Sequence, residues 1–269
     1  MKLDDIIDDV GERLKGTPLL VMLDVDGTLA PIAPTPEQAA IPPATLAQLR
    51  RIAAAPGTIL AFVSGRAAQD TWRMTGVEGA IVAGNHGVEL RMPNGQIEVS
   101  SFVLRHEKAI AAAADVLASE LARVSGAIVE NKRWTISVHY RLVADEYVER
   151  LRRRATEIAR QHGLRVMDGK KIVELRPDVE VNKGTATVAL AERFDVGPAN
   201  GSVVYVGDDL TDEDAFRALR KALPLSVTIR VVHGDGASAT AAEWTVGGTD
   251  DVRELLAWLA KRRNPADAR

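Results

Sequence analysis

The stretch Leu19-Leu20-Val21-Met22-Leu23-Asp24-Val25-Asp26-Gly27-Thr28 decides the fold. Its first five residues form a continuous apolar run, which is typical of a parallel strand buried on both faces. Further apolar runs occur at 59–63, 80–83, 203–206 and 227–232, and helical patterns such as 45–55 and 183–193 lie between them. Strands that alternate with helices predict an α/β fold, in which helices cover both faces of a parallel sheet.

The middle of the chain has a different pattern. An expected long helix at 105–123 leads to short strands at 127–130 and 134–141. The second strand alternates apolar and polar residues, which favours an antiparallel sheet buried on one side. A helix at 145–161 and short strands at 164–167 and 171–175 follow. The sequence therefore predicts a core domain at 1–104 and 182–269, with a smaller α+β domain at 105–181 inserted between its two parts.

Composition excludes several classes of protein. Of the 269 residues, 46% are hydrophobic and 26% are charged, as in folded globular chains. No cysteine is present, which excludes disulfide scaffolds, thiolate-ligated metals and cysteine nucleophiles. A net charge of −3 and only 4% aromatic residues disfavour nucleic-acid binding. Neither a signal peptide nor a stretch of about 18 apolar residues is visible, so we expect no membrane partner and a cytoplasmic location.

Two carboxylates follow the first apolar run. Asp24 and Asp26 are spaced i, i+2, so on an extended chain both project to one side at the carboxyl end of the strand. Ligands of open α/β sheets bind at that edge. Because neighbouring carboxylates repel, each needs a cation or a proton. The alternative is a capped turn with solvated acids, which the preceding buried strand makes less attractive.

A second acidic group follows the run at 203–206, in the stretch Gly207-Asp208-Asp209-Leu210-Thr211-Asp212-Glu213-Asp214. Bunched acids at a strand end are tolerable if they hold a hard cation, and oxygen ligands without cysteine indicate Mg²⁺. A helix N-terminus also favours acids and suits Thr211, Asp212 and Glu213. It accounts less well for Asp208 and Asp209.

Donors for a phosphoryl group occur in two places. Ser64 and Arg66 follow the run at 59–63, and Lys183 begins an expected helix. A hydroxyl, an ammonium and a helix N-terminus are groups that bind phosphate. Combined with the acids, they predict phosphoryl transfer in which Asp24 attacks phosphorus and Asp26 is the general acid and base. No Gly-x-Ser-x-Gly or Walker motif supports another hydrolase mechanism.

These motifs resemble, in order, those of the haloacid-dehalogenase-like phosphatases. The longer strings at 24–32 and 207–216, supported by shorter ones at 64–66, 84–87, 130–132, 138–141 and 173–177, resemble trehalose-6-phosphate phosphatases in particular. The resemblance implies a Rossmann-like parallel-sheet core of the haloacid dehalogenase type with an inserted α+β cap domain. It also implies a Mg²⁺-dependent phosphoric monoester hydrolase that converts trehalose 6-phosphate to trehalose through an aspartyl-phosphate, coupled in function to a synthase.

The resemblance also assigns residues. It implies that Asp24, Asp26, Asp208 and Asp209 hold or flank Mg²⁺, Asp26 through its carbonyl. Ser64 and Lys183 would hold phosphoryl oxygens. Arg66, Asn85 and His86 would lie between core and cap, and Glu130, Lys132 and Glu174 would bind sugar hydroxyls.

Other interpretations remain open at this stage. Glu130 and Lys132 would also suit a simple exposed ion pair, and His139 suits a plain surface histidine. The substrate could be another phosphosugar, such as sucrose phosphate or a glycosyl phosphoglycerate. A non-catalytic phosphosugar sensor would not need Asp24, Asp26, Lys183 and Asp208 together, and a phospho-accepting receiver domain would need only about half this length.

Overall fold

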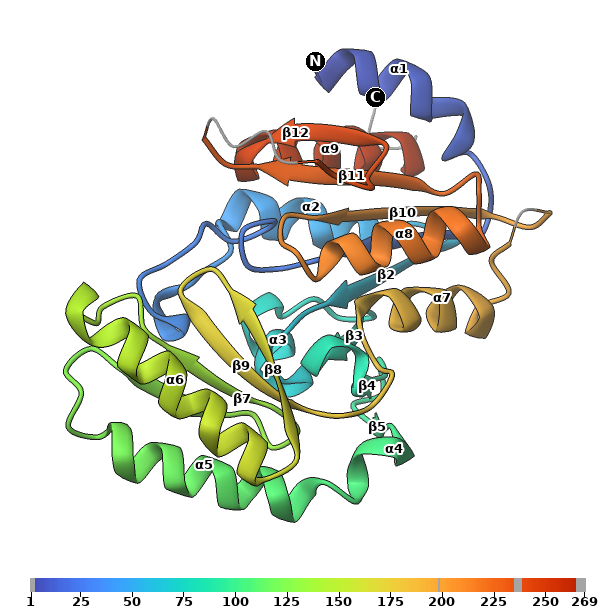
Figure 1. Ribbon diagram of the computed structural model, residues 1–269. Coiled ribbons are helices and arrows are strands. Elements are labelled where there is room, and N and C mark those ends of the chain that lie inside the picture. The colour runs from blue at the N-terminus through green and yellow to red at the C-terminus, as the bar shows by residue number, and fades with distance from the viewer. Residues whose placement is uncertain (1–2, 198, 235–238, 265–269) are drawn as a thin grey trace. The chain divides into compact units, whose positions relative to one another are not determined.

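The structure is a computed structural model that describes residues 3–197, 199–234 and 239–264. The chain divides into two compact units, seen in Figure 1. Unit 1 comprises residues 1–32, 39–98 and 181–269, and unit 2 comprises residues 33–38 and 99–180. Residues 1–2, 198, 235–238 and 265–269, which the sequence assigns to the core domain, lie outside the described residues.

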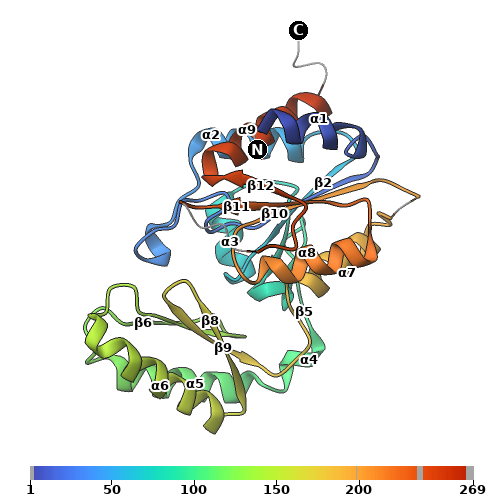
Figure 2. The same ribbon diagram turned by 45° about the horizontal axis from the view of Figure 1, so that its top comes forward.

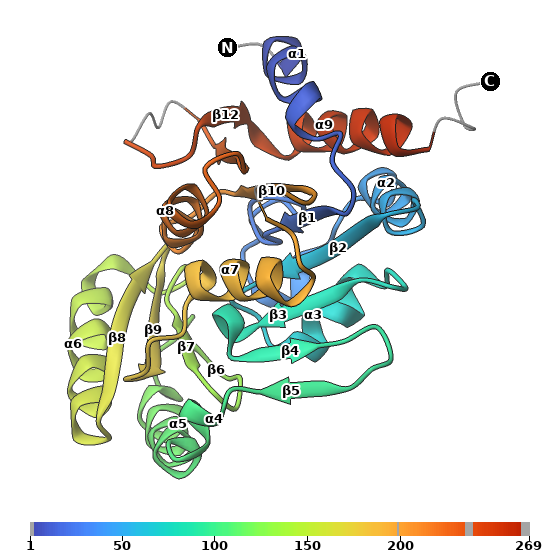
Figure 3. The ribbon, with the colours of Figure 1, turned by 90° about the vertical axis from the view of Figure 1, so that its right-hand side faces the viewer.

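Unit 1 is built on an eight-stranded sheet with the order β12-β11-β10-β1-β2-β3-β4-β5 (Figure 3). Its strands are β1 (Leu19–Leu23), β2 (Thr58–Val63), β3 (Ile81–Gly84), β4 (Glu89–Arg91), β5 (Ile97–Val99), β10 (Ser202–Gly207), β11 (Val227–Val232) and β12 (Trp244–Gly247). The six strands from β12 to β3 pair in parallel, and β4 turns back antiparallel to β3. The parallel core confirms the predicted α/β class.

Helices cover both faces of this sheet, because successive strand residues point to opposite faces and both sets are apolar. Leu19, Val21 and Leu23 face a core formed with helices α1 (Leu3–Arg13), α2 (Pro43–Ala53), α3 (Ala68–Thr75) and α9 (Gly248–Arg263). Leu20 and Met22 face α7 (Lys183–Arg193) and α8 (Asp212–Ala222). Figure 2 shows α7 and α8 on the opposite side of the strands from α2 and α9.

Unit 2 is a four-stranded antiparallel sheet with helices on one face (Figures 1 and 2). Its strands, in the order β6-β7-β9-β8, are β6 (Ile128–Asn131), β7 (Ile136–His139), β9 (Ile172–Pro177) and β8 (Leu164–Gly169). Its helices are α4 (Ser101–Leu104), α5 (Glu107–Leu121) and α6 (Asp145–Gln161), with the short 3-10 turn η1 (Pro36–Gln38). Ile136, Val138 and Val173 pack under α5 and α6, so alternate residues form a second, polar face.

Several predicted elements match the structure and others differ for local reasons. The predicted helix at 105–123 is α5, which begins and ends two residues inside the predicted range. The short helix α4 precedes it and was not predicted; the chain turns between the two at His106, whose N–H donates to the Val103 carbonyl at 2.9 Å. The proline-rich loop at 31–43 ends where α2 begins at Pro43, since a proline at the first helical position gives up no hydrogen bond. Among the described helices, none combines the length and apolarity that a bilayer crossing requires.

The contact between α7 and α8 depends on a glycine, which gives a stability prediction. A Cβ added at Gly184 would lie 2.6 Å from the Asp214 carbonyl oxygen, so the helices must move apart to admit alanine. We expect Gly184→Ala to lower the free energy of unfolding by about 1–3 kcal/mol. Urea denaturation measures this.

Gly197→Ala is the matched control, because an added Cβ there meets no atom within 4 Å and φ is not positive. Equal stability of the two variants would show that the close approach of α7 and α8 is not a constraint.

Candidate active site

The expected core residues gather at one edge of the unit 1 sheet. Asp24 and Asp26 follow β1, Ser64 follows β2, Asn85 follows β3 and Asp208 follows β10. These strands are parallel neighbours, so their carboxyl ends meet at the same edge. Helices α7 and α8 also begin there, and their N-termini favour negative charge. Residues spread over nearly 190 positions of the chain thus form one polar site.

A buried ammonium lies at the centre of the site. Lys183 Nζ donates to Asp24 Oδ1 at 2.7 Å and to Asp212 Oδ1 at 2.7 Å. All three side chains are buried, and Lys183 is only 2% exposed. The helix that carries Lys183 begins with a capping box, in which Asn182 Oδ1 accepts from the Thr185 N–H at 2.9 Å and Thr185 Oγ1 accepts from the Asn182 N–H. This cap fixes the first turn of α7 and with it the stem of Lys183.

Asp212 accepts hydrogen bonds on both of its oxygens. Oδ1 receives Lys183 Nζ and the Tyr205 hydroxyl, and Oδ2 receives the N–H groups of Asp208 and Asp209 at 2.9 Å each. Sequence reasoning assigned Asp212 to a helix N-terminus and missed this function. The Asp208-x-x-x-Asp212 spacing across a turn into a helix is the signal that could have found it.

Burial and neighbouring charges raise the pKa values of Asp24, Asp212 and Lys183, that of Asp212 to about 7. Burial raises the pKa of the Asp24 carboxyl, Lys183 opposes this, and the nearby carboxylates of Asp212, Asp208 and Asp209 raise it further. Burial alone would lower the pKa of Lys183, but Asp212 and Asp24 raise it well above its ordinary value. Lys183 therefore stays protonated, and the carboxyl groups around it outnumber the one ammonium.

The excess of carboxylates fits a divalent cation. Among the described residues, oxygens of Asp24, Asp208 and Asp212 lie within 4.8 Å of one another. Oxygen donors of this kind suit Mg²⁺. Because Asp212 is already occupied by four protein donors, Asp24 and Asp208 are the side chains best able to bind the ion. A Cβ at Gly27 would lie 2.3 Å from Asp208 Oδ2, so the glycine leaves the room that Asp208 needs.

Asp26 and Arg66 form a bidentate ion pair. Arg66 Nε donates to Asp26 Oδ2 at 2.6 Å, and Nη2 donates to Oδ1 at 2.7 Å. Asp26 remains partly open to solvent, with 42% of its side chain exposed. Ser64 is buried, and its Oγ accepts from the Arg66 N–H at 3.2 Å. The structure thus brings three predicted residues together, with Arg66 directed at Asp26.

Asn85 and His86 lie in a strained turn, η2 (Asn85–Gly87), after β3. Their φ angles are +48° and +60°, values that L-residues rarely adopt. The Asn85 N–H donates to the Arg66 carbonyl at 2.7 Å, and the His86 N–H donates to the Ser64 carbonyl at 2.9 Å. These two bonds join the loops that follow β2 and β3, so both residues belong to the same edge as Ser64.

Asp209 is turned toward its own loop. Its Oδ1 accepts from the Thr211 N–H at 2.8 Å, the Thr211 hydroxyl at 2.7 Å and the Asp212 N–H at 3.1 Å. Burial opposes ionisation, yet Lys183 and these hydrogen bonds hold the pKa of Asp209 well below its usual value. Its carboxylate does not belong to the group formed by Asp24, Asp208 and Asp212. It accepts instead from the N–H groups at the beginning of α8.

His233 is a second residue that sequence reasoning did not assign. Its Nε2 lies 2.7 Å from the Gly27 carbonyl oxygen and 3.6 Å from Asp208 Oδ2. It comes from the loop after β11, and its sequence neighbours carry no ligand pattern. Only the fold brings it to the turn that follows Asp26.

The expected sugar-binding residues lie on the polar face of the unit 2 sheet or at its end. Lys132 Nζ donates to Glu174 Oε1 at 3.3 Å, and Arg176 Nε donates to Glu174 Oε2 at 2.8 Å. Glu130 Oε2 lies 2.9 Å from His139 Nε2. Glu130 is therefore paired with His139, and His139 belongs to this polar network rather than to a plain surface.

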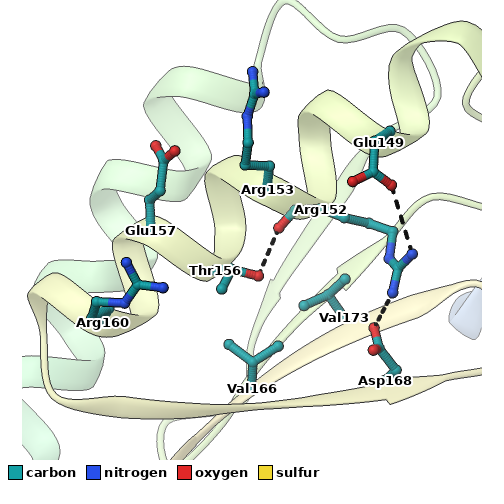
Figure 4. A pocket seen from close by; sticks show the side chains of 9 residues that line it. All are labelled: Glu149, Arg152, Arg153, Thr156, Glu157, Arg160, Val166, Asp168 and Val173. Atoms are coloured by element: carbon teal, nitrogen blue, oxygen red, sulfur yellow. Dashed lines mark hydrogen bonds and ion pairs between the residues drawn. The ribbon is translucent and has the colours of Figure 1, made fainter.

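A surface hollow of about 430 Å³ lies on the helix side of the same sheet, between α6 and strands β8 and β9 (Figure 4). Three arginines and three acids line it, together with Val166, Val173 and Thr156. Arg152 is held there by Asp168 at 2.9 Å and by Glu149 at 3.9 Å. The charges balance within the hollow, and the opposite face of the sheet carries Glu130 and Glu174.

Comparison with known proteins agrees with this geometry. An uncharacterised glycosyl hydrolase of Mycobacterium tuberculosis is 40% identical over 229 residues, which cover 84% of this chain and 17% of the relative. The trehalose-phosphate phosphatase of the same species is 34% identical over 254 residues, covering 93% of this chain and 63% of the relative. The chain therefore spans less than two thirds of the length of either relative.

A solved structure and a family model complete the comparison. The crystal structure of a trehalose-6-phosphate phosphatase related protein superposes with a TM-score of 0.78 at 27% identity, covering 93% of this chain and all of the other. It confirms the expected haloacid-dehalogenase-type fold. The trehalose-phosphatase family model matches residues 22–250. The chain therefore belongs to the trehalose-phosphatase family.

Proposed function

We propose that the protein is a Mg²⁺-dependent phosphatase that hydrolyses trehalose 6-phosphate through an aspartyl-phosphate. The observation that carries this proposal is the contact of Lys183 Nζ with Asp24 Oδ1 at 2.7 Å, beside the carboxylate of Asp208. A nucleophilic carboxylate can approach an anionic phosphoryl group only where fixed positive charge offsets the repulsion. Lys183 and the N-termini of α7 and α8 supply such charge here.

In the first step, an Asp24 oxygen attacks phosphorus and the bond from phosphorus to the sugar oxygen breaks. Asp26 gives its proton to that oxygen, so trehalose leaves as a neutral alcohol. Arg66 orients Asp26 through its two hydrogen bonds. Ser64 and Lys183 bind phosphoryl oxygens.

In the second step, Asp26 takes a proton from a water molecule as that water attacks phosphorus. The bond between phosphorus and Asp24 breaks, and inorganic phosphate is released. Asp26 is suited to both proton transfers because its side chain is 42% exposed, whereas Asp24 is buried. A partly exposed carboxyl group has access to water, with which it can exchange protons. A buried carboxylate has no such access and stays available for attack.

Asp24, Asp208 and the Asp26 carbonyl would hold Mg²⁺. When bound, the ion neutralises negative charge shared by the carboxylates and the phosphoryl group. Thr28 Oγ1 donates to Asp24 Oδ2 at 3.2 Å and helps to fix the orientation of the carboxylate. Asp24 and Asp208 would thus serve the charge balance, and Thr28 the geometry of attack.

The sugar would be bound by Glu130, Lys132 and Glu174 of unit 2. These charged groups suit a molecule with many hydroxyls, since each carboxylate accepts and each ammonium donates several hydrogen bonds. A trehalose-6-phosphate synthase would supply the substrate. This assignment draws on the family and on the relatives named above, and it is tested with alternative phosphosugars.

The substrate proposal predicts a rank order of activities. With Mg²⁺ present, we expect kcat/KM for trehalose 6-phosphate to exceed that for sucrose 6-phosphate and glucose 6-phosphate by at least about tenfold, because each missing or misplaced hydroxyl leaves a charged group unpaired. Phosphate release measures the three rates. A higher kcat/KM for another phosphosugar would contradict the choice of trehalose while leaving the phosphatase mechanism in place.

Asp24→Asn tests the nucleophile. We expect kcat to fall by more than about 10³-fold, because the amide cannot form the phosphoryl ester. Circular dichroism should show an unchanged fold, since the asparagine oxygen still accepts from Lys183 and its NH2 group can donate to the Thr28 hydroxyl oxygen. Asp70→Asn, on the exposed side of α3, is the control and should retain full activity. Substantial turnover by Asp24→Asn would contradict the covalent mechanism.

Removal of metal tests the role of Mg²⁺. We expect chelation to abolish activity and readdition of Mg²⁺ to restore it. If the ion binds with a Kd near about 1 mM, 10 mM Mg²⁺ raises Tm by about 3–5 °C. Asp208→Asn should remove this increase, whereas Asp115→Asn on the exposed face of α5 should keep it. An unmodified protein whose Tm does not change when Mg²⁺ is added would contradict the binding of this ion.

A further inference from the structure

Tyr205 is a buried phenol whose hydroxyl the mechanism above does not use. It lies in β10, is fully buried, and points to the face that packs under α7 and α8. Its ring meets the Phe216 ring edge-on, with centroids 5.7 Å apart. A phenylalanine would fill the same apolar space, and a buried hydroxyl costs free energy unless it has a partner. The hydroxyl therefore needs an explanation of its own.

The partner of that hydroxyl is Asp212. Tyr205 Oη donates to Asp212 Oδ1 at 2.5 Å, and Lys183 Nζ donates to the same oxygen at 2.7 Å. The other oxygen is fixed by the N–H groups of Asp208 and Asp209. A Cβ at Gly207 would lie 2.3 Å from Asp212 Cγ, so the carboxylate is also confined by the strand end beneath it.

These contacts determine where the ammonium lies. Lys183 Nζ is 2.7 Å from both Asp24 Oδ1 and Asp212 Oδ1, so it is shared between the nucleophile and its neighbour. The Tyr205 hydroxyl takes part of the accepting capacity of Asp212 Oδ1. Without the hydroxyl, that oxygen is free to draw the ammonium toward itself and away from Asp24.

We propose that Tyr205 is a positioning residue, whose hydroxyl acts through Asp212 to hold the Lys183 ammonium against Asp24. The inference rests on the proposed phosphatase function and deepens it. The hydroxyl of Tyr205 donates to Asp212, which the proposed function assigns neither to the substrate nor to Mg²⁺. Removal of its hydroxyl therefore affects the transfer step more than sugar binding.

Tyr205→Phe tests the inference, because it removes one oxygen and keeps the ring. We expect kcat for trehalose 6-phosphate to fall about tenfold or more, as for loss of a hydrogen bond to a charged group, with KM changed less than about twofold. Tyr140→Phe, which alters the buried tyrosine of unit 2, is the control and should keep both constants. A Tyr205→Phe variant with unchanged kcat, or with a change confined to Tm, would overturn the proposal.

A spectroscopic measurement tests the contact itself without relying on activity. The chain has three tyrosines, so the full protein labelled with 3-fluorotyrosine gives three ¹⁹F signals, each assigned by its Tyr→Phe variant. We expect the Tyr205 signal to shift in Asp212→Asn and in Lys183→Met, while the Tyr140 and Tyr147 signals stay in place. A Tyr205 signal that does not shift in either variant would refute the contact of Tyr205 with Asp212 and its link through Asp212 to Lys183.

The two measurements also separate this inference from the proposed function. If the unmodified protein has no phosphatase activity, the proposed function is wrong, and so is the effect of Tyr205 on catalysis. An active protein in which Tyr205→Phe is fully active would remove only the inference about Tyr205.

Discussion

The sharing of one buried ammonium between two carboxylates is the interaction on which the site depends. Lys183 lies 2.7 Å from both Asp24 and Asp212, and almost no part of the three side chains reaches solvent. Buried charges are tolerated only when they are paired and hydrogen-bonded, so every neighbouring element has to supply a partner. The cap of α7, the turn into α8 and the end of β10 all meet this demand. The same demand places a tyrosine hydroxyl in the apolar layer under α8.

A similar balance of charge occurs on the polar face of unit 2. Glu174 is held by Lys132 and Arg176, and Glu130 is paired with His139. The protein has few aromatic side chains for ring stacking, so this face offers a ligand mainly hydrogen bonds from fixed charges. Holding each carboxylate in place before the ligand arrives reduces the entropic cost of binding. The site of unit 1 and the polar face of unit 2 thus share one physical feature, charged groups that are held in place by their neighbours.

Strong local patterns allowed much of the fold to be predicted. Strand β1, helix α7 and helix α6 have the predicted bounds, because a continuous apolar run or a long amphipathic period is a property of neighbouring residues. The short strands β4 and β5 were not predicted, since three residues at a sheet edge carry too little pattern. The short helix α4 was not predicted for a similar reason, since four residues also carry too little pattern. The alanine-rich stretch that follows was predicted as one helix, and it is one helix, α5.

The sequence by itself determined which residue types are available to the site and predicted the chemistry proposed for it. The strings around Asp24, Ser64, Lys183 and Asp208 predict a phosphoryl-transfer centre, because residue types and their positions after buried strands are local properties. Tertiary structure alone decided which partner each group has. It paired Asp26 with Arg66 and Glu130 with His139, brought His233 to Gly27, and placed Asp212 between Lys183 and Tyr205. The physical reason is that hydrogen bonds and ion pairs act over about 3 Å in space, and distance along the chain does not determine that separation.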